Sequence, residues 1–98
     1  MKSITPITKT RAHLMISGRV QGVCYRDFAK NEATTRHLTG WIRNLPSGQV
    51  EAVFEGEREI IEKMIALCHK GPPGASVHEL VVSWEDLKQE FDDFRIVH

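Results

Sequence analysis

The spacing of apolar residues switches between strand-like and helix-like along this chain of 98 residues, and the order of the switches strongly constrains the fold. Alternating apolar side chains indicate strands, and apolar side chains three or four residues apart indicate amphipathic helices. Strands are expected at residues 11–17, 41–44, 49–55 and 77–85, helices at residues 25–38 and 57–69, and a short fifth strand within residues 91–97. The order β-α-β-β-α-β predicts a ferredoxin-like α+β sandwich, in which two helices cover one face of an antiparallel sheet. Many unrelated functions use this architecture, so the fold alone does not decide the function.

Length, charge and hydropathy set the class of protein. A chain of this length forms one domain, which we expect at residues 11–98 after a flexible N-terminal tail of residues 1–10. Thirteen basic and thirteen acidic residues give a formal net charge of zero, which argues against broad electrostatic binding to nucleic acid or to an anionic membrane. No apolar run approaches the ~20 residues that span a bilayer, and the start lacks the apolar stretch of a signal peptide. We therefore expect a monomeric, soluble, cytoplasmic protein with no nucleic-acid or membrane partner.

The segment GRVQGVCYR at residues 18–26 has the composition of an anion-binding loop. Gly18 and Gly22 allow the backbone to curl and to approach a ligand closely, and several N–H groups in such a curl can converge on one anion. The expected helix that follows adds unpaired N–H donors at its N-terminus. Arg26 supplies a planar guanidinium that matches two oxygens of a phosphate or carboxylate. The segment therefore predicts an oxyanion cradle, and phosphate fits it best.

Two long segments resemble the signature segments of the acylphosphatase family: GRVQGVCYR at residues 18–26 and GWIRNLPSGQVEAVFEG at residues 40–56. Residues 68–73 and 94–96 resemble two further landmarks of that family, so the similarity covers about residues 11–98. The resemblance implies a small hydrolase that cleaves the carboxyl-phosphate bond of acyl phosphates to a carboxylate and inorganic phosphate. It also implies that the reaction needs no metal ion or other cofactor.

The same resemblance assigns roles to individual residues. Arg26 is similar to the family's phosphate-binding arginine, and Asn44 is similar to the residue that holds the attacking water. The backbone amides of residues 21–25 resemble the phosphate cradle, which with Arg26 gives the binding set Gln21, Gly22, Val23, Cys24 and Tyr25. Tyr25 replaces the phenylalanine that is usual in the family, and its additional hydroxyl group needs a hydrogen-bond partner or water.

The chemistry of these residues suits an acyl phosphate. Phosphoryl transfer needs positioning and charge stabilisation more than covalent catalysis, and the Arg26 fork can bridge two phosphoryl oxygens. Asn44 cannot act as a general base, but its amide oxygen can accept a hydrogen bond from water and so orient it. The motif contains no evident general acid. A leaving carboxylate, with a pKa of about 4, departs without protonation, whereas an alkoxide from a phosphate monoester needs an acid or a metal ion.

Topology is expected to bring Arg26 and Asn44 together. Arg26 follows the first strand, and Asn44 ends the second strand. In a β-α-β unit the C-terminal ends of the two parallel strands lie at the same edge of the sheet, so the two side chains can share one pocket.

Several other polar residues have simpler interpretations. Cys24 lies within the cradle, where a helix N-terminus could acidify its thiol; we interpret it as a bystander, with redox sensitivity as the alternative. Cys24 does not match the nucleophile of C-x-x-x-x-x-R phosphatases, because that position is Val20. The histidines and cysteines have no metal-ligand spacing, so we expect no metal site. Arg19 and Arg43 are interpreted as solvated strand-end charges, and the alternative is that they add positive potential around the anion.

Two alternative functions remain open. A non-catalytic ferredoxin-like module that binds RNA needs aromatic side chains on its central strands and a basic sheet face, and this sequence has neither an RNP-like string nor a net positive charge. A carbamoyl phosphate-handling domain, like those fused to hydrogenase maturation proteins, continues into zinc-finger segments. This sequence ends at His98, so we expect a stand-alone acylphosphatase-like enzyme.

Overall fold

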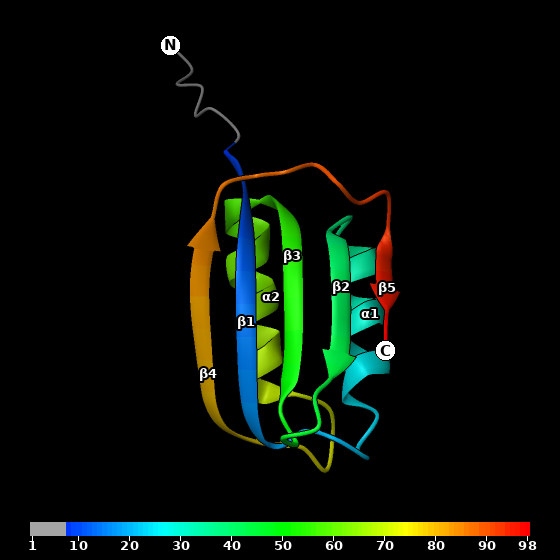
Figure 1. Cartoon of the computed structure of the whole chain (residues 1–98). Helices are drawn as coiled ribbons and strands as arrows, with labels where there is room; N and C mark the ends of the chain where they lie inside the picture. The colour runs from blue at the N-terminus through cyan, green and yellow to red at the C-terminus, as the bar shows by residue number, and fades with distance from the viewer. Residues whose placement is uncertain (1–7) are drawn as a thin grey trace.

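The computed structural model describes residues 8–98 and contains five strands and two helices in that range. The elements follow the predicted order, as the colours of Figure 1 show along the chain. They are β1 (Lys9–Arg19), α1 (Tyr25–Thr35), β2 (Thr39–Asn44), β3 (Val50–Glu57), α2 (Arg58–Lys70), β4 (Ser76–Glu85) and β5 (Phe94–Ile96).

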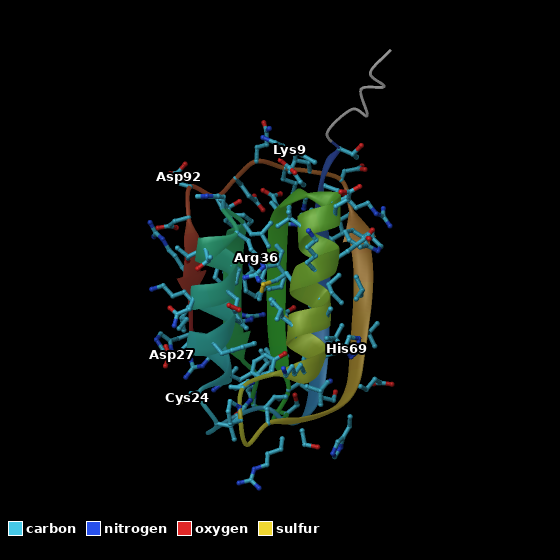
Figure 2. The ribbon with its side chains drawn as sticks, turned by 180° about the vertical axis from the view of Figure 1, so that it is seen from behind. Lys9, Cys24, Asp27, Arg36, His69 and Asp92 are labelled. Carbon is cyan, nitrogen blue, oxygen red and sulfur yellow. The ribbon has the colours of Figure 1, made fainter. Side chains whose placement is uncertain are left out.

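The strands form one sheet in the order β4-β1-β3-β2-β5. The four long strands pair antiparallel with their neighbours, whereas β5 pairs in parallel with β2. Both helices lie on one face of the sheet, as the view from behind in Figure 2 shows. The ferredoxin-like α+β fold is therefore confirmed, with one parallel pair added at the edge of a sheet that we expected to be antiparallel.

The first strand begins earlier than the sequence predicts. Lys9 and Thr10, which we assigned to the N-terminal tail, belong to β1 and pair with Glu57 and Gly56 of β3. Lys9 and Thr10 are polar, so no apolar alternation marks this part of the strand. Thr8 directly precedes β1, and residues 1–7 of the expected tail lie outside the described residues.

The core lies between the sheet and the two helices. Side chains of β1 and β3 that alternate along each strand face the helices and are fully buried: Ala12, Leu14, Ile16, Val50, Ala52 and Phe54. The helices bury Ala29, Ala33, Ile61, Met64 and Cys68 against them. Each large aliphatic or aromatic side chain buried here contributes about 1.5–3 kcal/mol. This packing fixes the loops at the ends of the strands on a rigid scaffold.

Helix α1 ends at Thr35, three residues before the predicted end at Leu38. His37 takes a positive φ of 58°, and the Leu38 N–H donates back to the Ala33 carbonyl at 2.9 Å. This is the hydrogen-bond pattern of a Schellman C-terminus. We had expected Gly40 to end the helix, but Gly40 lies within β2 opposite Phe54. Sequence reasoning missed this end because a histidine occupies the left-handed position where glycine is usual.

In the described part of the chain, neither helix is long and apolar enough to cross a membrane.

Candidate active site

The loop after β1 and the end of β2 lie at the same edge of the sheet, as expected. The two parallel strands of the expected β-α-β unit are not neighbours, because β3 lies between β1 and β2. Because β3 is antiparallel to both, β1 and β2 still run in parallel and end at the same edge. Figure 1 shows this edge at the bottom, where β1 leads into α1 and β2 turns into β3.

A cavity of about 490 Å³ opens at this edge. It is lined by Val20, Gln21, Gly22, Cys24, Tyr25, Arg26, Asp27, Asn44, Ile96 and His98. The structure therefore brings Arg26 and Asn44 to one cavity, together with most of the predicted cradle. The exception is Val23, which is absent from the lining and packs partly buried against the core.

The loop that leads into α1 has the shape of a cradle. Gly22 and Cys24 both take positive φ angles, of 75° and 61°. A Cβ atom built on Gly22 would meet nothing within 4 Å, so the backbone there faces open space. Cys24 is the N-cap of α1, makes no side-chain capping bond, and is labelled at the lower end of the helix in Figure 2. The first N–H groups of a helix have no intrahelical acceptors, so those of α1 are available to an anion.

The first glycine of the motif has a different role from the second. Gly18 lies within β1, where the register with β4 shifts between Ser17 and Gly18. A Cβ atom at Gly18 would lie 2.2 Å from the Ser76 carbonyl oxygen, and φ is 128° there. Gly18 therefore permits close contact between β1 and β4, whereas Gly22 shapes the cradle.

Asn44 presents an unsatisfied amide to the site. It is the last residue of β2 and lies opposite Val50 of β3. Residues opposite each other share a face of the sheet, and Val50 is fully buried on the helix side, so the Asn44 side chain lies on that side too. Its Oδ1 atom is buried and has no hydrogen-bond partner among residues 8–98. An unmade hydrogen bond of this kind destabilises a protein by about 1–3 kcal/mol, so the amide is suited to a ligand or water.

Two larger cavities, of about 560 and 660 Å³, lie away from the cradle. They combine basic side chains with acidic ones, Glu55 and Glu57 in the first and Asp92 and Asp93 in the second. Size alone therefore does not identify the site. The smaller cavity is the one that holds Arg26, the open backbone of the cradle and the unsatisfied Asn44 amide.

Comparison with known proteins agrees with this geometry. The family model described as Acylphosphatase matches residues 12–96. An acylphosphatase from Pelotomaculum thermopropionicum is 46% identical over 90 residues, which cover 92% of this chain and 98% of the relative. This chain belongs to the acylphosphatase family. An acylphosphatase from Pyrobaculum arsenaticum is 50% identical over 88 residues, which cover 89% of this chain and 93% of the relative.

Solved structures give the same result. The crystal structure of an acylphosphatase from Bacillus subtilis superposes with a TM-score of 0.88 at 30% identity and covers 91% of this chain and 99% of that chain. Full-length HypF, solved in a phosphate- and nucleotide-bound form, superposes with a TM-score of 0.82 at 28% identity. The match covers 96% of this chain but 12% of HypF. The expectation of an acylphosphatase-family enzyme is therefore confirmed. Membership of this family supports the hydrolysis of acyl phosphates and does not support the alternative of a non-catalytic RNA-binding module.

Within this acylphosphatase site, the structure supplies the partner that the Tyr25 hydroxyl needs. The hydroxyl donates a hydrogen bond of 2.6 Å to the Cys68 carbonyl near the end of α2. Burial raises the pKa of Tyr25 above its usual value and raises the pKa of the Cys68 thiol to about 12. Cys24 and Cys68 are both free thiols, the first exposed and the second buried.

Sequence reasoning missed four residues that line the candidate cavity: Val20, Asp27, Ile96 and His98. Val20 and Asp27 are next to or within the motif and could have been found from it. Ile96 and His98 reach the cavity because β5 pairs with β2. The Val97 N–H, between these two residues, donates to the Ile42 carbonyl of β2 at 2.9 Å. A three-residue strand gives no signal of the strand with which it pairs.

Neither flanking arginine lines the cavity. The Arg43 guanidinium binds the Glu51 carboxylate at 2.7 Å. It also lies over the Trp41 ring, with 5.3 Å between the guanidinium carbon Cζ and the ring centroid. Because Glu51 offsets its charge, Arg43 adds little positive potential near the cradle. Arg19 ends β1 and is exposed, which fits the simpler interpretation.

Proposed function

We propose that Arg26 and the backbone amides of residues 21–25 bind the phosphoryl group of an acyl phosphate, and that Asn44 orients the attacking water. The observation that carries this proposal is the single cavity that Arg26, the cradle and the unsatisfied Asn44 amide share. The reaction is metal-independent, because the guanidinium and the N–H groups supply the positive charge that a phosphoryl group requires. All of these residues come from one chain, so the proposed site needs no residue from a partner subunit, and we propose a monomeric enzyme.

The proposed mechanism is an in-line displacement. The Arg26 fork bridges two equatorial oxygens, and the water held by Asn44 attacks phosphorus from the side opposite the acyl oxygen. The bond from phosphorus to that oxygen breaks, and the carboxylate leaves with the electron pair. A water proton passes to a phosphate oxygen, so the products are a carboxylate and inorganic phosphate. Holding the water in line lowers the barrier, since its freedom is lost before the reaction.

The same residues favour a carboxylate as the leaving group but do not select one acyl group. Arg26 and Asn44 recognise phosphate and water rather than the acyl group, so several acyl phosphates, carbamoyl phosphate included, meet the requirements of the site. Asp27 and His98 also line the cavity, and we propose that neither protonates the leaving group, because a carboxylate leaves without a proton.

The first prediction tests these roles. Arg26→Ala and Asn44→Ala are each expected to lower the kcat for benzoyl phosphate by at least ~10²-fold, because each removes a group that stabilises or aligns the transition state. Hydrolysis is measured in EDTA, beside p-nitrophenyl phosphate as the monoester, and circular dichroism verifies the fold. Arg19→Ala is the matched control, because it removes an exposed arginine outside the cavity.

Near-normal turnover by either folded variant would refute the role of that residue. Loss of activity in EDTA would contradict metal independence. Turnover of p-nitrophenyl phosphate without turnover of benzoyl phosphate would overturn the choice of substrate. Asp27 and His98 would then be the candidates for a general acid that protonates the leaving group.

A further inference from the structure

One side chain ties the phosphate cradle to the hairpin that carries Asn44. The amide nitrogen Nε2 of Gln21 donates one hydrogen bond to the Leu45 carbonyl at 2.9 Å and another to the Gln49 carbonyl at 2.8 Å. Leu45 follows Asn44 directly, and Gln49 precedes the first residue of β3. Both hydrogens of one amide group therefore hold the two ends of the β2–β3 turn.

The turn closes without help from Gln21. The Leu45 N–H donates to the Gln49 carbonyl at 2.8 Å, and the Gly48 N–H donates to the Leu45 carbonyl at 3.0 Å. Each carbonyl that Gln21 contacts therefore already has a backbone partner. The bonds from Gln21 do not form the turn; they fix its position relative to the loop after β1.

A second contact joins the same two parts of the chain. The Gln49 side-chain amide donates to the Ser17 hydroxyl of β1 at 2.9 Å. Ser47 donates to the Gln49 side-chain oxygen at 2.9 Å, but this bond is exposed and stays within the turn. The hairpin is therefore held to the β1 side from its base, while its tip is free of such contacts in the described structure.

We propose that the Gln21 side chain is a positioning residue, which sets the distance between the water held by Asn44 and the phosphoryl group in the cradle. The inference rests on the proposed function, and it goes beyond the role of Gln21 as one backbone amide of the cradle. Backbone and side chain act separately here, because a substitution at Gln21 keeps its N–H. A loss of alignment of about 1 Å can slow a reaction ~10²-fold, so the contact controls turnover rather than binding.

The test replaces the amide by a group of similar length that cannot donate. Gln21→Met is expected to lower the kcat for benzoyl phosphate about 10- to 100-fold. The KM, and the inhibition constant of inorganic phosphate, are expected to change less than about 3-fold, because Arg26 and the cradle N–H groups remain. Ser47→Ala is the matched control, because it removes the two hydrogen bonds of the Ser47 hydroxyl within the same turn and keeps both carbonyls that accept from Gln21.

A double-mutant cycle separates positioning from a general structural effect. If Gln21 acts through Asn44, then Gln21→Met changes the kcat less than about 3-fold in the Asn44→Ala background. An equal loss in both backgrounds, a loss confined to KM, or a wild-type kcat in folded Gln21→Met would each overturn the proposal. If Gln21→Met does not fold by circular dichroism, Gln21→Asn gives the same test, because its amide is one methylene too short to reach both carbonyls.

The same series distinguishes the two levels of inference. If the wild-type enzyme does not hydrolyse benzoyl phosphate, or if Asn44→Ala retains full activity, the proposed function fails. If Asn44→Ala loses activity but Gln21→Met does not, only the positioning role of Gln21 fails.

Discussion

At the scale of single residues, the Tyr25 side chain links the start of α1 to the end of α2. Its buried hydroxyl donates to the Cys68 carbonyl, and Tyr25→Phe leaves that carbonyl without its donor. We expect the free energy of unfolding to fall by about 1–2 kcal/mol and the melting temperature to fall by about 4–8 °C per kcal/mol. The kcat is expected to stay within about 3-fold of the wild type, because the substitution keeps the Tyr25 N–H, which is the group that we propose for phosphate binding. Thermal unfolding measures the change in stability, and benzoyl phosphate hydrolysis measures the change in kcat. Unchanged stability would show that the hydrogen bond makes no net contribution to the free energy of unfolding.

The residue types of the candidate site could be predicted from the sequence, but their surroundings could not. Arg26 and Asn44 stand out because only a few residue types can bridge phosphate oxygens or orient a water molecule. The contacts of the Gln21 side chain could not be predicted, because its acceptors are backbone carbonyls and any residue carries one. Gly18 was misread for a related reason: its restriction comes from the Ser76 backbone of β4, which is 58 positions away in the sequence.

At the scale of elements, Arg11 of β1 holds the connection between β4 and β5. Its guanidinium contacts Glu85 at 3.0 Å, Glu90 at 2.6 Å and Glu55 at 3.4 Å. Glu55, whose side chain is 2% exposed, also accepts the Lys88 N–H at 2.9 Å. Figure 1 shows this connection crossing the edge of the sheet opposite the cradle. One arginine of β1 therefore holds the end of β4 and the irregular segment after it against β3.

Removal of that arginine leaves the buried Glu55 carboxylate without its counter-charge. Arg11→Met is expected to lower the free energy of unfolding by about 3–5 kcal/mol, as measured by urea denaturation. Arg11→Met combined with Glu55→Leu is expected to recover part of the loss. Arg95→Met is the control in the same region, because its pair with Asp93 is exposed, and such a pair contributes no more than about 1 kcal/mol. Equal effects of the two arginine variants would contradict the role of Arg11.

Elements were predictable where they bury an apolar stripe, and less so where they do not. The alternation of Ala12, Leu14 and Ile16 and the stripe of Ile61, Met64 and Cys68 identified β1 and α2, because burial imposes those periods. The start of β1 and the end of α1 were wrong by two and three residues, since backbone hydrogen bonds define them without an apolar signal.

At the scale of the whole molecule, the sheet leaves one face uncovered by helices, and polar contacts occupy much of it. Glu51 of β3 accepts a hydrogen bond from Arg43 of β2 at 2.7 Å and lies 2.7 Å from the His13 ring nitrogen of β1. One carboxylate thus links the three central strands. The strand order that makes this possible could not be predicted, because the sequence pattern allows β1 and β2 to be neighbours as well as to be separated by β3.

The Glu51 cluster makes stability depend on pH in a defined direction. Partial burial acts to raise the pKa of Glu51, but the hydrogen bonds from His13 and Arg43 outweigh it, so its pKa lies below the ordinary value of 4.5. A carboxyl group with a lowered pKa in the folded state stabilises the protein above the pKa of the unfolded state, and this stabilisation is lost as the pH falls through the folded-state pKa.

We therefore expect the wild type to exceed Glu51→Gln in free energy of unfolding above the ordinary pKa value of 4.5, and the difference to shrink as the pH falls below that value. The comparison must be a difference between the two proteins, because the other twelve acidic residues of the thirteen titrate in the same range. Urea unfolding at a series of pH values measures it. A difference that grows as the pH falls would contradict the lowered pKa, since it would mean that protonation of Glu51 favours the folded state. A difference that persists unchanged down to the lowest pH at which both proteins still fold would show that Glu51 stabilises the sheet by packing rather than by its charge.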